Sequence, residues 1–175
     1  MNSDEARQGK APAAVRPPEP WQVLLRDWLY GARRLMVIGV GSDLHADDAA
    51  GRLVVESLAA APPWIERFYA GTIPERASSA IRKATPSHVL IVDSAATGLD
   101  PGSVSIRSLE EADLPPSTHS APFSLLARFL SDTGAAWLLL AIQPASLDYL
   151  TPVSAPVARA AREMAAFIRE LPSPE

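Results

Sequence analysis

Four polar side chains of this chain could take part in catalysis or metal binding. Asp47 and Asp48 belong to the segment GVGSDLHADDAAG, Asp93 ends the run VLIVDSA, and His119 lies in the loop STHSAP. An imidazole brought to two carboxylates would make a nitrogen and oxygen site suited to Ni, Zn, Fe or Mn. Two carboxylates sharing a proton would instead form an aspartic dyad.

Other sites that use glycine or acids fit the segment from Gly39 to Gly51 poorly. A dinucleotide fingerprint needs a third glycine where this chain has Leu44. A phosphate loop needs a Gly-Lys-Ser/Thr ending, and the acids here would repel a phosphate. The chain also contains neither Gly-x-Ser-x-Gly nor HEXXH, and it has no cysteine. The segment is therefore suited to a cation or a hydrogen-bond donor.

Each of the three acids also has a purely structural interpretation. Asp47 could cap a helix and Asp48 could stabilise its first turn, worth about 1 kcal/mol. Asp93 could bond the backbone of its own turn. His119 stands apart, because neither helical periodicity nor a core position accounts for it.

The elements that must position these residues alternate between apolar runs and helical periods, as in a layered α/β domain. We expect a three-layer α/β/α sandwich around a five-stranded, mostly parallel twisted sheet with one antiparallel edge strand. The expected strands are Leu35–Val40, Ile65–Ala70, His88–Asp93, Ser103–Arg107 and Ala136–Ile142, and the expected helices are about 48–60, 72–84, 123–131 and 152–171. The third of these helices follows the Pro- and Ser-rich loop that contains His119, and the second opens with an apparent capping box from Thr72 to Glu75.

The topology of such a sheet would bring the acids together. If the second strand lies on one side of the first and the third on the other, the ligand crevice falls between strands one and three. Asp47 or Asp48 would then meet Asp93 at the carboxyl ends of these strands.

Composition predicts one domain preceded by a tail. The 175 residues carry a net charge of -4 and are 47% hydrophobic. We expect a flexible Pro-rich tail over 1–20, an amphipathic helix over 21–34 and a single α/β domain over 35–175. The longest apolar run, 135–142, is too short to cross a membrane, and no secretory signal is evident, so we expect a cytoplasmic protein. Scattered basic residues argue against nucleic-acid binding.

The ordered motifs resemble the hydrogenase maturation proteases, which remove a C-terminal extension from the large subunit of nickel-iron hydrogenases. The resemblance covers about 34–169. It is carried by GVGSDLHADDAAG, by Ile91 to Asp93, by Thr118 and His119 with a proline three residues later, and by the IQP that begins at Ile142. Pro74 with Glu75 and the Thr-His-x-x-Pro pattern are closest to the branch that serves formate-hydrogenlyase-type hydrogenases.

The resemblance implies specific roles. Asp48, Asp93 and His119 would contact nickel, with Asp48 and Asp93 as the catalytic acids of an aspartic-type endopeptidase, and Gly41 and Ser42 would contact the substrate. It also implies that nickel is carried by the precursor of the hydrogenase large subunit, which is the expected partner, rather than held permanently.

Two alternatives remain open at this stage. The chain could be a nickel-dependent binding or checkpoint protein that does not cleave the subunit, which Ser42 favours, because the family usually has Asn there. It could also be a metal hydrolase acting on a small molecule. Hydrolysis itself could use metal polarisation of the carbonyl or an aspartate acting as base toward water.

Overall fold

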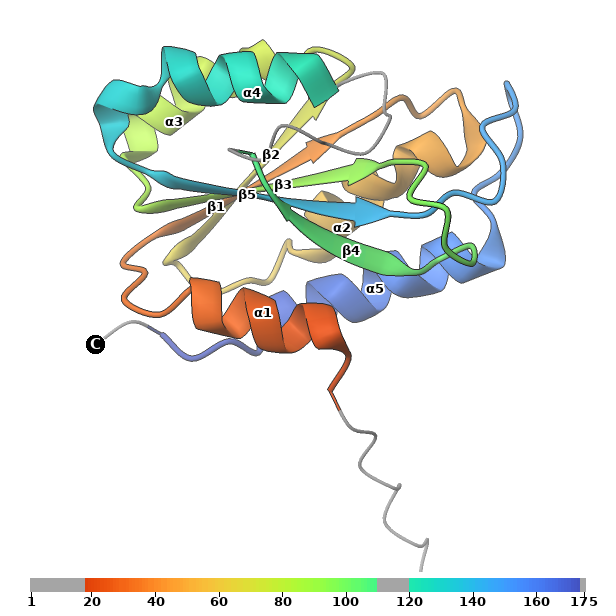
Figure 1. Ribbon diagram of the computed structural model, residues 1–175, viewed down its shortest axis with the longest axis horizontal. Coiled ribbons are helices and arrows are strands. Elements are labelled where there is room, and N and C mark those ends of the chain that lie inside the picture. Colours follow the sequence, from red (N-terminus) through yellow and green to blue (C-terminus); the bar gives the residue numbers. More distant parts are fainter. Residues whose placement is uncertain (1–17, 110–119, 174–175) are drawn as a thin grey trace, which may run out of the picture.

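The computed structural model describes residues 18–109 and 120–173. The predicted tail up to residue 17 and His119 lie outside the described residues. In the described part, the expected α/β sandwich is confirmed (Figure 1).

The sheet contains five strands in the order β2-β1-β3-β5-β4. Their bounds are β1 Leu35–Val40, β2 Ile65–Gly71, β3 His88–Ser94, β4 Val104–Ser108 and β5 Ala136–Ile142. Strands β1, β2, β3 and β5 are parallel, whereas β4 pairs antiparallel with β5 at the edge. Every residue of β1 is buried, which explains its uninterrupted apolar sequence. Because β2 and β3 flank β1, the expected switch point between β1 and β3 is confirmed.

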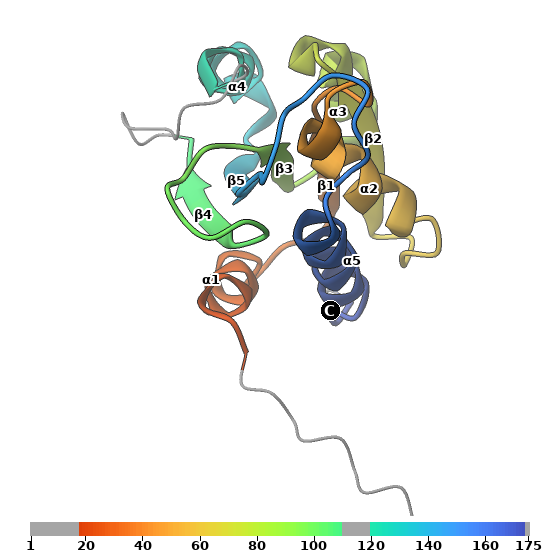
Figure 2. The same cartoon turned by 90° about the vertical axis from the view of Figure 1, so that its right-hand side faces the viewer.

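Helices cover both faces of the sheet. They are α1 Pro20–Trp28, α2 Ala50–Ser57, α3 Ser78–Ala84, α4 Ser120–Phe129 and α5 Ala155–Arg169, with short 3-10 helices η1 Ala46–Ala49, η2 Pro74–Ala77 and η3 Ser131–Thr133. One core joins α1, α2 and α5 to one face of the sheet, and a second joins α3 and α4 to the other face. Figure 2 shows these two layers edge-on. None of the helices within the described ranges is long and apolar enough to cross a membrane.

Two expectations about helix ends were wrong. The leading helix ends at Trp28 rather than near residue 34, because the chain turns through Gly31 at a φ of 75°. The predicted capping box does not form: the residue before η2 is Ile73, with no side-chain cap. Pro74 starts that helix instead, since its fixed φ suits a first position and its missing N–H is not needed there.

The approach of α2 to the sheet depends on Gly51. A Cβ atom on Gly51 would lie 2.6 Å from the carbonyl oxygen of Val92 and would also overlap Val40. The first turn of α2 can therefore touch β1 and β3 together only if no side chain stands there. This contact fixes where η1, which immediately precedes α2, meets the sheet edge.

The buried carboxylate of Asp47 fixes the loop between β5 and α5. Its Oδ2 accepts hydrogen bonds from the backbone N–H of Ala145 (2.7 Å) and of Ser146 (3.1 Å), and from the hydroxyl of Ser154 (2.9 Å). Its Oδ1 accepts the N–H of Ser154 at 2.6 Å. Asp47 is thus not the cap of its own helix, as the structural interpretation supposed. It holds the loop that leads into α5, which Figure 2 shows passing over η1.

Replacing Gly51 with Ala should destabilise the protein by about 3 kcal/mol, because backbone on two strands would have to move. Gly134→Ala is the control: no atom lies within 4 Å of the added Cβ atom, so only the left-handed backbone of Gly134, at a φ of 67°, should cost stability, about 1 kcal/mol. Urea denaturation of both variants measures this difference. Equal losses would mean that the contact of α2 with the strands is not tight.

Asp47→Asn should cost about 2–3 kcal/mol, since an amide nitrogen would face donors that now bind a charged oxygen. Asp43→Asn is the control, because Asp43 is exposed and pairs with Arg52 on the surface, so the loss of stability should stay below about 1 kcal/mol. Hydrogen exchange at Ala145 and Ser146 should increase in the first variant alone. Unchanged exchange there would contradict the role assigned to Asp47.

Candidate functional site

The candidate site begins at a tight turn after β1. Gly41 has a φ of 122°, and a Cβ atom on it would overlap the carbonyl oxygen of Asp48. The N–H of Ser42 donates a hydrogen bond of 2.6 Å to Oδ2 of Asp48, and the N–H of Leu44 donates one of 3.2 Å to the Ser42 hydroxyl. Gly41 and Ser42 therefore position the Asp48 carboxylate. Ser42 itself does not take up a positive φ, so the serine fits this turn without that strain.

Tyr69 on β2 supports the same turn, and sequence analysis missed it. Its hydroxyl donates a hydrogen bond of 2.8 Å to the carbonyl oxygen of Gly41, while the Gly41 N–H donates to Gly71 at 2.9 Å. Burial and the nearby charge of Asp43 raise the pKa of Tyr69 above its usual value. The phenol consequently remains a donor at neutral and moderately alkaline pH. A tyrosine near the carboxyl end of a neighbouring strand was the only signal available.

Asp93 stands at the carboxyl end of β3 and is fully buried. Because side chains alternate along a strand, it leaves the sheet on the same face as Val89 and Ile91, beneath α3 and α4. Burying a carboxylate costs free energy that an apolar residue at this position would not. A carboxylate buried at this position therefore has to be compensated within the fold, as that of Asp47 is, or serve a function.

Asp48 and Asp93 are brought to the same sheet edge. Asp48 is half-buried in η1, which contacts β3, and three residues later Gly51 touches the carbonyl of Val92, next to Asp93. Roughly 45 residues of sequence separation are closed by the fold, as the switch-point argument expected.

His119 falls outside the described residues, but the helix that follows it is informative. Helix α4 ends shortly before β5 begins at the amino edge of the sheet, so it runs against the strands and begins at the carboxyl edge (Figure 1). Its core side chains lie on the face toward which Asp93 points. The described structure thus resumes at Ser120 on the face and edge where Asp93 lies.

Gln143, which directly follows β5, lies at the same edge of the sheet. Its Oε1 accepts hydrogen bonds from the N–H of Thr97 (2.7 Å), the hydroxyl of Thr97 (3.0 Å) and the N–H of Gly98 (3.0 Å). Its Nε2 donates to the carbonyl of Pro144 at 3.1 Å. The IQP segment therefore fixes the loop that follows β3, just beyond Asp93.

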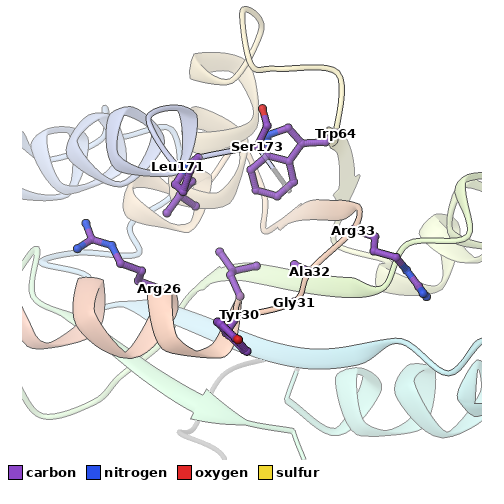
Figure 3. Close-up of a pocket in the computed structure, with 10 residues that line it drawn as sticks. Arg26, Tyr30, Gly31, Ala32, Arg33, Trp64, Leu171 and Ser173 are labelled. Carbon is purple, nitrogen blue, oxygen red and sulfur yellow. The ribbon is translucent and has the colours of Figure 1, made fainter. Parts of the chain in front are cut away.

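Within the described ranges, no group of three or more His, Cys, Asp or Glu side chains is arranged to hold a metal ion. A cavity of about 460 Å³ lies at the opposite, amino edge, where Ala32 precedes β1 and Trp64 precedes β2 (Figure 3). It is separate from the acids described above.

Comparison with known proteins gives a consistent result. A family model described as HycI, hydrogenase maturation protease, matches residues 53–170, a span that includes Asp93 and His119 and begins after Asp48. The hydrogenase 3 maturation protease of Escherichia coli K12 is 33% identical over 128 residues, which are 70% of this chain and 80% of that protein.

Solved structures agree with the sequence comparisons. The crystal structure of a [NiFe] hydrogenase maturation protease HycI from Thermococcus kodakarensis is similar with a TM-score of 0.77 at 29% identity, covering 84% of this chain and 97% of that one. The hydrogenase maturating endopeptidase HybD of Escherichia coli gives a TM-score of 0.61 at 25% identity, covering 78% and 93%. The chain belongs to the hydrogenase maturation protease family and has the fold of its peptidases.

Proposed function

We propose that this protein is an aspartic-type endopeptidase that removes the C-terminal extension of a nickel-iron hydrogenase large-subunit precursor after nickel insertion. The observation that supports this most strongly is the arrival of Asp48 and Asp93 at one sheet edge, in a chain of this family. In this proposal the nickel is part of the substrate. Asp48, Asp93 and His119 bind it and so test whether the precursor is loaded.

Recognition of nickel would place the peptide to be cut beside the carboxylates. Holding the reacting groups together in this way can supply a large part of a rate increase. One carboxylate then takes a proton from water, whose oxygen attacks the peptide carbonyl carbon; the C–N bond breaks and the leaving nitrogen takes up a proton. The turn of Gly41 and Ser42 keeps Asp48 in place for this step.

The precursor and nickel together test this function. Purified protein mixed with a nickel-loaded large-subunit precursor should shorten it, and mass spectrometry should show the loss of one C-terminal peptide. A nickel-free precursor should keep its mass, because the groups that contact nickel would have nothing to bind. Cleavage that does not depend on nickel would contradict recognition of the metal, and stable binding without any cleavage would favour a checkpoint protein.

Substitution of the acids and the histidine tests the site. Asp48→Asn, Asp93→Asn and His119→Ala should each slow processing by about 100-fold or more. Their far-ultraviolet circular dichroism should stay like that of the parent protein. Asp132→Asn is the control, since this acid is exposed and pairs with Arg82 on the surface. Normal processing by the Asp93 variant would rule out the proposed site.

Nickel binding by the isolated protein separates this function from a small-molecule metal hydrolase. A resident catalytic metal requires tight binding without substrate, whereas substrate-borne nickel requires only weak binding. We therefore expect nickel titration calorimetry to show no saturation at micromolar concentrations. A tight one-to-one complex that Asp93→Asn abolishes would favour the hydrolase.

A further inference from the structure

A group of exposed apolar side chains borders the candidate site. Leu44, Leu147, Tyr149 and Leu150 are 47%, 51%, 61% and 70% exposed. We call these four residues the apolar rim. They come from two loops at the carboxyl edge of the sheet, one after β1 and one after β5. Gathered apolar side chains at the surface commonly mark a binding site.

The two loops are joined into one surface. The N–H of Leu150 donates a hydrogen bond of 2.7 Å to the carbonyl oxygen of Leu44. His45 and Tyr149 form an antiparallel bridge, and their rings lie 5.2 Å apart. The Nδ1 atom of His45 lies 3.4 Å from the carbonyl oxygen of Leu147. The four rim residues are therefore neighbours in space, although about 100 residues separate the two loops.

The rim is continuous with the site. The N–H of Asp48 donates a hydrogen bond of 2.8 Å to the carbonyl of His45, which links the rim to the turn that bears the candidate catalytic acid. On the other side, Asp47 holds Ala145 and Ser146 just before the second loop. A ligand on the rim would thus lie beside Asp48.

The conformation of Leu150 supports a binding role. This leucine has a φ of 54°, a left-handed conformation that costs roughly 1 kcal/mol for a residue with a Cβ atom. Since its side chain is mostly exposed, burial on folding does not offset this cost. An exposed apolar side chain on a strained backbone is better explained by contact with a partner than by a role in folding.

The charges around the rim restrict the partner. Apart from the buried Asp47, residues 41–51 contain Asp43 and Asp48 and no Lys or Arg, and residues 143–155 contain one Asp and no Lys or Arg. Arg52 follows the first segment, but it pairs with Asp43 and Glu56. A surface that combines leucines and a tyrosine with acids is complementary to an apolar peptide segment without acidic side chains.

We propose that the apolar rim binds an apolar, non-acidic segment of the precursor polypeptide and so docks it beside Asp48. This inference rests on the proposed function, which makes the substrate a protein, and it assigns the surface that recognises the polypeptide in addition to nickel.

Leu150→Gly tests the rim most cleanly, because glycine keeps the left-handed backbone and removes only the side chain. We expect KM for processing of the nickel-loaded precursor to rise about tenfold, the effect of losing one well-packed apolar contact, while kcat stays near that of the parent protein. Leu24→Ala is the control: Leu24 is similarly exposed, at 51%, but lies on α1 away from this edge. Thermal unfolding should show that Leu150→Gly is no less stable than the parent.

Measuring binding separately from cleavage distinguishes a failure of the rim proposal from a failure of the proposed function. Biolayer interferometry with immobilised precursor should show about tenfold weaker binding of Leu150→Gly than of Leu24→Ala. If the parent protein cleaves the precursor and the two variants match it in KM and in binding, the rim proposal is wrong while the proposed function stands. If the parent never cleaves, the proposed function fails, and the binding comparison alone decides the rim. Light scattering that shows a dimer dissociated by Leu150→Gly would assign the rim to a second copy of this chain and overturn the proposal.

Discussion

The contact of helix α2 with two strands at once is the constraint on which the site depends. Gly51 lets the first turn of α2 rest against Val40 on β1 and Val92 on β3. Because η1 leads directly into α2, the same contact determines where the Asp48 turn meets the end of β3. A single missing side chain thus sets the placement of the two acids, and no long-range ion pair is needed to bring them together.

The two adjacent acids of this turn have different tasks, which their positions in η1 explain. Asp47 points inward and accepts four hydrogen bonds from the loop before α5, so its charge is compensated within the fold. Asp48 is only half-buried, and its carboxylate is oriented by the N–H of Ser42. One carboxylate therefore stabilises the structure while its neighbour is presented at the edge of the sheet.

The strands and the switch point between β1 and β3 could be predicted from the sequence, since uninterrupted apolar runs such as β1 identify strands buried on both faces. The role of Asp47 could not, because its donors lie about 100 residues away and are mainly backbone N–H groups. The hydrogen bond from Tyr69 to the Gly41 turn could not be predicted either, because it depends on β2 lying beside β1. The capping box failed because Pro74 provides its own helix start. Local patterns thus identified elements, whereas the supports of the site arise from tertiary contacts.

The loops around the site are held by those tertiary contacts rather than by local preference. Ala46 and Leu150 both have positive φ, which their side chains disfavour, and yet the loops that contain them are fixed to each other and to Asp47. Loops ordered in advance lose less conformational entropy when a partner binds. The strain in these loops is then offset by a smaller entropic cost when a partner binds. Ordering of these loops before binding thus connects the hydrogen bonds of Asp47, the exposed leucines of the rim and the position of Asp48.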